Sequence, residues 1–145
     1  MNKKVGILGT GSYVPENIVD NLYFEKILDT SDEWIKTRTG ISKRRKARDN
    51  ESASDLATKA AIKAIECANL TPQDIDLIIV ATATPDMTFP STACLVQENI
   101  KAKNAAAFDI SAACSVFIYG ITIAKQFVQT NMYKNVLVIG RPLKK

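Results

Sequence analysis

The chain has 145 residues, of which 46% are hydrophobic and 23% charged, the proportions of a soluble globular protein and not of a disordered or collagen-like one. Its 19 Lys and Arg against 15 Asp and Glu leave a net charge of +4, which permits anionic ligands without requiring a nucleic acid. It contains no histidine, which excludes a histidine base, a histidine-ligated metal and a Ser-His-Asp triad within these residues.

The first half of the chain is expected to alternate short strands and helices. Residues 5–8 form an apolar run before Gly9-Thr10-Gly11, which predicts a strand ending in a tight turn. One or two short helices are expected within residues 21–41, followed by a basic loop over residues 43–48. Ser52-Ala53-Ser54-Asp55 fits a capping box and predicts the start of an amphipathic helix.

The second half continues the alternation. Residues 77–81 and 135–140 are β-branched runs typical of buried strands, and residues 105–110 predict a weaker strand between them. A helix is expected to open at residues 90–92, and another over residues 116–128 is apolar nearly all round. The pattern predicts an α/β fold with a mostly parallel sheet and helices on both faces.

No membrane segment is expected, because the longest uncharged stretch, residues 110–124, is shorter than the ~20 apolar residues that span a bilayer. The N-terminus lacks the cleavage site of a secretory signal, and the three cysteines form no C-x-x-C pair. These features favour a cytoplasmic protein with reduced thiols and no metal site.

Cys114 is the residue with the clearest chemistry. It follows an apolar strand and several small residues and precedes a long helix, whose first amides and dipole would favour a thiolate. A buried core cysteine is an equal reading of the same position. Cys67 and Cys94 fall within expected helices and are interpreted as packing residues.

Two other motifs have structural interpretations that are favoured over functional ones. The glycines at 9 and 11 suggest a dinucleotide fingerprint, but Val14 stands where a third glycine is needed and Pro15 interrupts the expected helix. The basic cluster at residues 43–48 is interpreted as a solvated surface, because no nucleic-acid module accompanies it.

The sequence resembles the N-terminal half of the β-ketoacyl-acyl carrier protein synthase III family, within the thiolase-like superfamily. Four blocks carry the resemblance, in the family's order: Gly9-Thr10-Gly11-Ser12-Tyr13-Val14-Pro15, residues 29–41 around Trp34 and Arg38, Phe89-Pro90-Ser91-Thr92-Ala93-Cys94, and residues 107–114 ending at Cys114. By this resemblance, residues 1–140 form an N-terminal thiolase-like domain, and residues 141–145 form a divergent tail.

The resemblance implies an acyltransferase that starts fatty-acid synthesis, with Cys114 as the acyl-accepting nucleophile. It implies that coenzyme A is held by Thr30, Trp34, Arg38 and Thr39, with Trp34 and Arg38 on either side of the adenine. It further implies that Phe89 lies at the acyl pocket and subunit interface. The substrates would be acetyl-CoA, or another acyl-CoA, and malonyl-acyl carrier protein, without a further cofactor.

The chain departs from the family in lacking the homologous second half that carries the catalytic His and Asn, so condensation by these residues alone is not expected. One alternative is a catalytically silent fragment that binds coenzyme A or self-associates, and another is a nucleic-acid binder that uses residues 43–48. A homodimer is expected, because one sheet cannot cover the all-apolar helix over residues 116–128.

Overall fold

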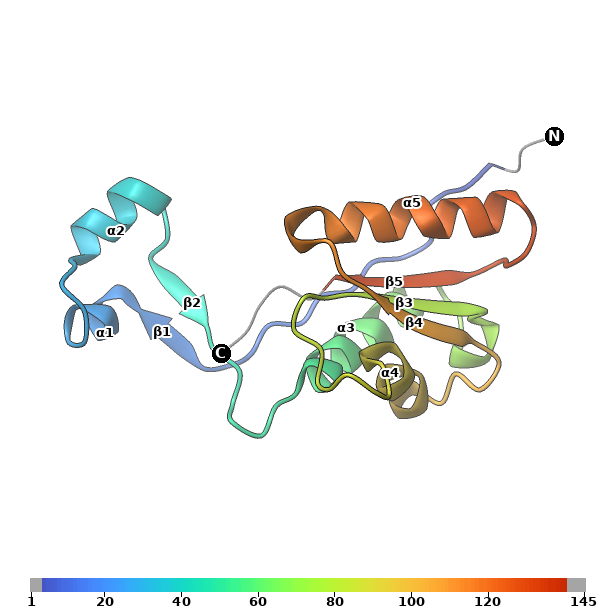
Figure 1. Ribbon diagram of the computed structural model, residues 1–145, viewed down its shortest axis with the longest axis horizontal. Coiled ribbons are helices and arrows are strands. Elements are labelled where there is room, and N and C mark those ends of the chain that lie inside the picture. Colours follow the sequence, from blue (N-terminus) through green and yellow to red (C-terminus); the bar gives the residue numbers. More distant parts are fainter. Residues whose placement is uncertain (1–3, 141–145) are drawn as a thin grey trace. The chain divides into compact units, whose positions relative to one another are not determined.

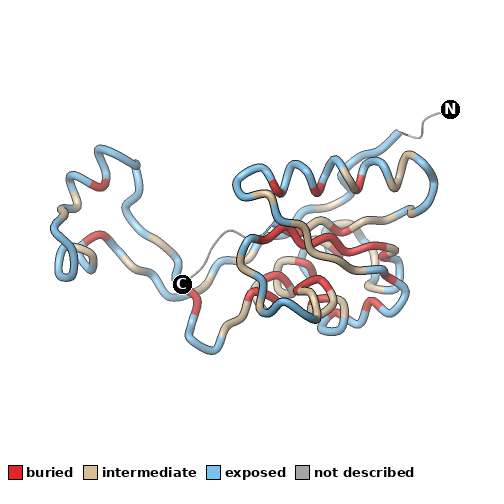
Figure 2. Tube along the Cα trace, in the orientation of Figure 1, coloured by how far each residue is buried: buried red, intermediate tan, exposed pale blue. Residues whose placement is uncertain are grey.

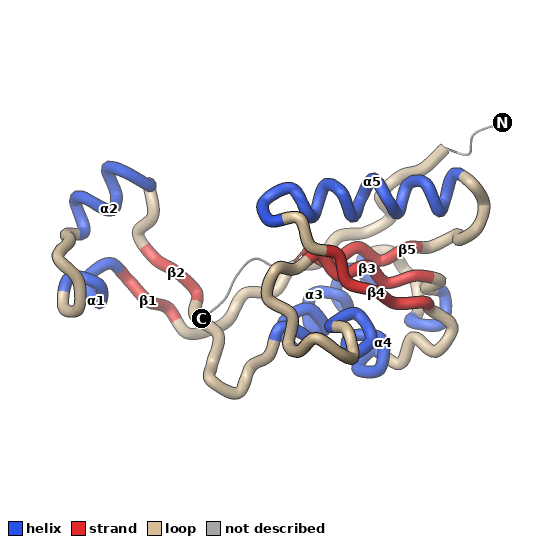
Figure 3. Tube along the Cα trace, in the orientation of Figure 1, coloured by secondary structure: helices blue, strands red, loops and turns tan. Residues whose placement is uncertain are grey.

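The computed structural model describes residues 4–140, and the tail proposed from the sequence at residues 141–145 lies outside them. The described chain divides into two compact units. The first contains residues 4–13 and 52–140, and the second contains residues 14–51. Each unit has its own secondary structure, shown in Figure 1 and Figure 3.

The first unit is built on a parallel sheet of three strands in the order β4-β3-β5. The central strand β3 (Leu77–Ala81) pairs with β4 (Ala106–Ile110) on one side and with β5 (Val136–Gly140) on the other. All five residues of β3 are buried, and buried residues are red in Figure 2. A run of β-branched and aliphatic residues suits such a strand, because both of its faces are covered. The predicted parallel α/β fold is confirmed.

Helices cover both faces of this sheet (Figure 1). On one face α3 (Ala53–Cys67) and α4 (Thr92–Ile100) pack against Ile78 and Val80 of β3. On the other face α5 (Val116–Gln129) packs against the alternate residues, Leu77 and Ile79. Two short 3₁₀ turns complete the unit: η1 (Pro72–Asp74) before β3, and η2 (Ala113–Ser115) before α5.

The start of α3 is held by the predicted capping box. The Ser52 hydroxyl accepts a hydrogen bond from the Asp55 amide, and the Asp55 carboxylate accepts one from the Ser52 amide. A second carboxylate, that of Asp86, accepts hydrogen bonds from the amides of Ala53 and Ser54. These contacts satisfy amides that have no partner within the helix and place negative charge at its positive end.

The second unit consists of two short helices and a two-stranded antiparallel ribbon. The helices are α1 (Asn21–Glu25) and α2 (Asp32–Thr39), as expected, and the ribbon pairs β1 (Ile18–Asp20) with β2 (Lys43–Arg45). The predicted loop over residues 43–48 is therefore wrong for its first three residues. Arg45 donates hydrogen bonds to the carbonyls of Pro15 and Glu16. One guanidinium of the basic cluster is therefore bonded to the backbone of its own unit.

The predicted strand at residues 5–8 does not form. Residues 5–8 pair with no strand of the sheet, and the N-terminal segment lies against α3 instead. Lys63 donates a hydrogen bond to the carbonyl of Ser12, and Gly9 and Gly11 lie directly against the backbone of α3. Ile7 and Leu8 are left 78% and 65% exposed.

Helix α5 is covered on one face only. Val116, Gly120 and Ala124 face the sheet and are buried, whereas Phe117 is 42% exposed and Ile118 is 62% exposed. The face of α5 that is turned away from the sheet is therefore apolar and exposed. None of the described helices is both long and apolar enough to cross a bilayer.

The close approach of Gly11 to α3 gives a stability test. A Cβ atom at Gly11 would lie 2.4 Å from the carbonyl oxygen of Ala60 and the amide nitrogen of Ala64, which are rigid backbone atoms. We expect Gly11→Ala to lower the free energy of unfolding by about 1–3 kcal/mol, measured by urea denaturation. Gly6→Ala is the matched control, because nothing lies within 4 Å of its Cβ. Equal stability of the two variants would contradict the packing.

Candidate active site

Cys114 lies in the turn that joins β4 to α5. Strand β4 ends at Ile110, the 3₁₀ turn contains Cys114, and α5 starts two residues later. Ala113 has a φ of +46°, in the left-handed region that costs a non-glycine residue of order 1–3 kcal/mol. The amide of Ser115 closes the turn on the carbonyl of Ala112. The result is a sharp turn that leaves Cys114 exposed, so the buried alternative is wrong.

The surroundings of this thiol favour negative charge. The Ser115 side chain makes no capping hydrogen bond to α5, and the first turn of the helix carries no acidic residue. The Val116 amide donates to the Ala113 carbonyl, whereas no side chain caps the amides that follow it, and the helix dipole places its positive end there. An oxyanion that forms at this turn would be stabilised by the same groups.

The other two cysteines differ from Cys114 in place and surroundings. Cys67 is the last residue of α3 and is exposed, so its interpretation as a packing residue is wrong. It lies at the negative end of a helix, the opposite environment to that of Cys114. Cys94 is half-buried in α4, where its sulfur lies 3.2 Å from the Ser91 hydroxyl.

Asp109 connects the strand that leads to Cys114 with the start of α4. Its two carboxylate oxygens accept hydrogen bonds from the amides of Thr92 (2.8 Å) and Ala93 (2.7 Å). Charge-assisted bonds of this kind fix the loop before α4 relative to β4. That loop contains the cis peptide bond between Phe89 and Pro90. The role of Asp109 gives no sequence signal, because its partners are backbone amides.

Phe89 lies on the surface of the first unit. Its side chain is 86% exposed, so the described residues do not enclose it. Its assignment to an acyl pocket or a subunit interface stays a prediction.

The second unit carries the other predicted site residues on and beside α2. Trp34 and Arg38 are four residues apart and therefore share one face of the helix. The Arg38 guanidinium lies 6.0 Å from the centre of the Trp34 ring, and the indole is 57% exposed. Two flat groups, one aromatic and one cationic, are presented together to solvent.

An open hollow of about 350 Å³ adjoins this face, lined by Asp29, Thr30, Ser31 and Trp34. The hydroxyl of Thr30 is buried and has no hydrogen-bond partner in the described structure. A buried polar group without a partner is uncommon, and a ligand atom in the hollow would satisfy it. Thr30 and Trp34 thus line the same hollow.

Thr39 differs from Thr30, Trp34 and Arg38 in that its hydroxyl is bonded within α2 and the residues that follow it. Its hydroxyl donates to the carbonyl of Ile35 (2.7 Å) and accepts from the amide of Ile41 (3.1 Å), so it closes the C-terminal end of α2. Gly40 continues this end with a φ of +70°, a left-handed cap that glycine adopts without strain.

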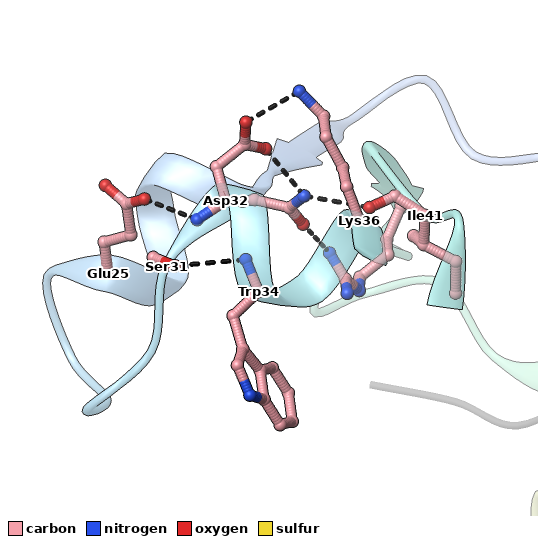
Figure 4. Close-up of polar contacts among 8 residues, drawn as sticks. Glu25, Ser31, Asp32, Trp34, Lys36 and Ile41 are labelled. Atoms are coloured by element: carbon pink, nitrogen blue, oxygen red, sulfur yellow. Dashed lines mark hydrogen bonds and ion pairs between the residues drawn. The ribbon is translucent and has the colours of Figure 1, made fainter. Parts of the chain in front are cut away.

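The start of α2 has a network that the sequence did not reveal (Figure 4). Hydrogen bonds from Lys36 and from Asn21 hold the pKa of Asp32 below its ordinary range. The Asn21 side chain is 1% exposed and has no sequence signature, because a single asparagine predicts no particular contact. Among the described residues, no group of three or more Cys, Asp or Glu side chains is placed to hold a metal ion.

Comparison with known proteins identifies relatives over most of the chain. The family model for 3-oxoacyl-[acyl-carrier-protein (ACP)] synthase III matches residues 108–142, which include the Cys114 turn. A β-ketoacyl-[acyl-carrier-protein] synthase III of Clostridioides difficile is 70% identical over 140 residues, which are 97% of this chain and 43% of the relative. One from Caldanaerobacter subterraneus is 67% identical over 135 residues, 93% of this chain and 41% of the relative.

Solved structures agree with the sequence relatives. The crystal structure of 3-oxoacyl-[acyl-carrier-protein] synthase III from Aquifex aeolicus matches with a TM-score of 0.90 and 58% identity, over 92% of this chain and 43% of that one. The priming β-ketosynthase of the R1128 polyketide pathway matches with a TM-score of 0.90 and 36% identity, over 92% and 40% of the two chains. The chain thus spans about two-fifths of the length of the proteins that it matches.

Proposed function

We propose that the chain, which belongs to the β-ketoacyl-[acyl-carrier-protein] synthase III family over the part that it spans, accepts an acyl group from an acyl-CoA onto Cys114 in the initiation of fatty-acid synthesis. The observation that carries this proposal is the exposed thiol in a strained turn at the uncapped start of α5. The preferred donor is acetyl-CoA, and no cofactor is needed beyond the thioester.

The chemistry is transthioesterification. The Cys114 sulfur, as thiolate, attacks the carbonyl carbon of acetyl-CoA, and the negative charge moves to the carbonyl oxygen. The intermediate collapses by breaking the bond to the coenzyme A sulfur, which leaves as a thiolate and takes a proton from solvent. Cys114 lies two residues before α5, so we assign to the amides at the start of that helix the stabilisation of the charge that develops on the carbonyl oxygen.

Coenzyme A recognition is assigned to the second unit. An adenine between Trp34 and Arg38 needs about 7 Å between their faces, since each stacking contact takes about 3.5 Å. The Arg38 guanidinium carbon lies 6.0 Å from the centre of the Trp34 ring, so the two side chains would have to separate to admit the adenine. The unpartnered Thr30 hydroxyl would hydrogen-bond the ligand, while Thr39 supports the helix end from which Arg38 projects.

Malonyl-acyl carrier protein is proposed as the second substrate of the family reaction, in the cytoplasm and away from membranes and nucleic acids. These 145 residues contain no histidine, so we assign them acyl transfer and not the decarboxylative condensation. The exposed face of α5 favours a second function, self-association into a homodimer.

The first prediction from the proposed function is selective acylation of Cys114. After incubation with acetyl-CoA, intact mass should rise by one acetyl group, and peptide mapping should place it on Cys114. Cys67 is the internal control, because it is exposed as Cys114 is but lies at the negative end of a helix. Cys114→Ser should abolish the label and Cys67→Ser should keep it. Equal labelling of both thiols would contradict a selectively activated Cys114.

The second prediction concerns coenzyme A binding. Coenzyme A should quench the fluorescence of Trp34, the single tryptophan, and Arg38→Ala should weaken the affinity about tenfold by removing a stacking cation. Arg48→Ala is the matched control, since its guanidinium pairs with Glu16 on the surface of the same unit. An unchanged affinity in Arg38→Ala would contradict the proposal that Trp34 and Arg38 hold the adenine between them.

The third prediction is dimerisation through α5. Light scattering on a size-exclusion column should give about twice the 15.9 kDa monomer mass at micromolar concentration. Ile118→Glu, at a position 62% exposed on α5, should give the monomer, because it places a charge in the apolar face. Ile62→Glu, on α3 and 42% exposed, is the control and should stay dimeric. A monomeric wild-type chain would overturn this proposal.

A further inference from the structure

We propose that Asn21 is the positioning residue of the nucleotide-binding helix: its buried amide fixes both ends of α2, so that Trp34 and Arg38 meet the ligand in one orientation. This inference rests on the proposed binding of coenzyme A by α2. Asn21 itself does not touch the ligand in this scheme.

Every polar atom of the Asn21 side chain has a partner. Its Nδ2 donates to Asp32 Oδ1 and to the carbonyl of Ile41, both at 2.8 Å, and its Oδ1 accepts from the Arg44 guanidinium at 2.6 Å. The residue is 1% exposed, so water cannot replace these bonds. Three hydrogen bonds in a buried place are directional and fix their partners relative to one another.

The two bonds from Nδ2 reach opposite ends of the same helix. Asp32 is the first residue of α2, and Ile41 lies two residues beyond its last. Ile41 is in turn joined to the helix by its amide, which donates to the Thr39 hydroxyl. One side chain therefore connects the beginning and the end of an eight-residue helix, which would otherwise be marginal by itself.

Further contacts carry the network to the rest of the second unit. The Glu25 carboxylate accepts from the Asp32 amide at 2.6 Å, and Lys36 pairs with the other Asp32 oxygen. The Arg44 guanidinium, while donating to Asn21, lies 4.7 Å from the centre of the Phe24 ring. In Figure 4 the Asp32 and Lys36 side chains meet on one side of α2, while the Trp34 indole points to the other. The network thus holds α2 from one side and leaves the binding face free.

The consequence for binding is entropic. A helix held at both ends presents Trp34 and Arg38 already in place, whereas a loosened helix must be ordered when the ligand arrives. Loss of the Asn21 amide should therefore weaken coenzyme A more than it weakens a small thioester without a nucleotide. A residue that only stabilised the fold would affect both donors alike.

The experiment uses Asn21→Ala in the full chain. We expect coenzyme A affinity, measured by Trp34 quenching, to fall about tenfold, because Asp32 and the Ile41 carbonyl lose their donor and the Arg44 guanidinium loses its acceptor. Acylation of Cys114 by acetyl-CoA at limiting concentration should fall in proportion, while acylation by S-acetyl-N-acetylcysteamine should not change. Asn99→Ala, which removes a surface bond to Thr58 in the other unit, is the matched control.

A second pair of variants covers the case in which Asn21→Ala does not fold. Asp32→Asn keeps an oxygen that can accept from Asn21, whereas Asp32→Ala removes it. We expect Asp32→Asn to bind coenzyme A within about threefold of the wild type, and Asp32→Ala to resemble Asn21→Ala. Equal affinities of the two Asp32 variants would overturn the inference.

A ligand-free measurement separates this inference from the proposed function. The steady-state anisotropy of Trp34 without coenzyme A should fall in Asn21→Ala, because the helix gains freedom, and should not change in Asn99→Ala. If the wild type fails to bind coenzyme A but the anisotropy falls as expected, the proposed function fails while Asn21 still positions α2. If the wild type binds and Asn21→Ala keeps both affinity and anisotropy, the inference is wrong.

Discussion

The burial of strand β3 is the constraint on which the first unit depends. Its five residues are at most 1% exposed, and both of its edges are hydrogen-bonded. A shift in its register would therefore cost much free energy, because it would move every side chain to the opposite face of the sheet. The register pairs Ala81 with Ile110 at the carboxyl end, which fixes where β4 leaves the sheet. The turn that bears Cys114 begins three residues later, at the carboxyl edge where open parallel sheets commonly bind ligands.

The same constraint accounts for features that lie away from β3 in the sequence. Asp109 is paired with Val80, so its place is set by the sheet before it binds the start of α4. Because α4 follows the Phe89 loop, the sheet places that loop and the Cys114 turn relative to each other. The N-terminal segment is excluded from β3 by the same pairing and lies on α3 through Gly9 and Gly11 instead.

Local chemistry was the part of the structure that the sequence predicted well. The Ser52 capping box, the run at Leu77–Ala81 and the short helix around Trp34 each contain their own signal, and each is present. The predicted strand at residues 5–8 is absent because a strand forms only beside a hydrogen-bonding partner, which can lie far away in the sequence and is not indicated by the apolar run itself. The left-handed Ala113 and the buried Asn21 gave no signal for the same reason, since surrounding structure imposes their conformation and contacts. Cys114 could thus be named from the sequence as the candidate nucleophile, but the contacts of Asn21 and the conformation of Ala113 could not be predicted.

The two units are stabilised by different means, which explains where polar networks matter. The first has a continuous apolar core on both faces of its sheet. The second spans only residues 14–51, and its buried residues are Asn21, Ile35 and Ala47. A segment of this size buries too little apolar surface to fix one conformation by hydrophobic packing alone. Directional hydrogen bonds must then specify how α2 is held, and a fully paired buried amide is well suited to that task because any misplacement leaves its polar atoms unsatisfied.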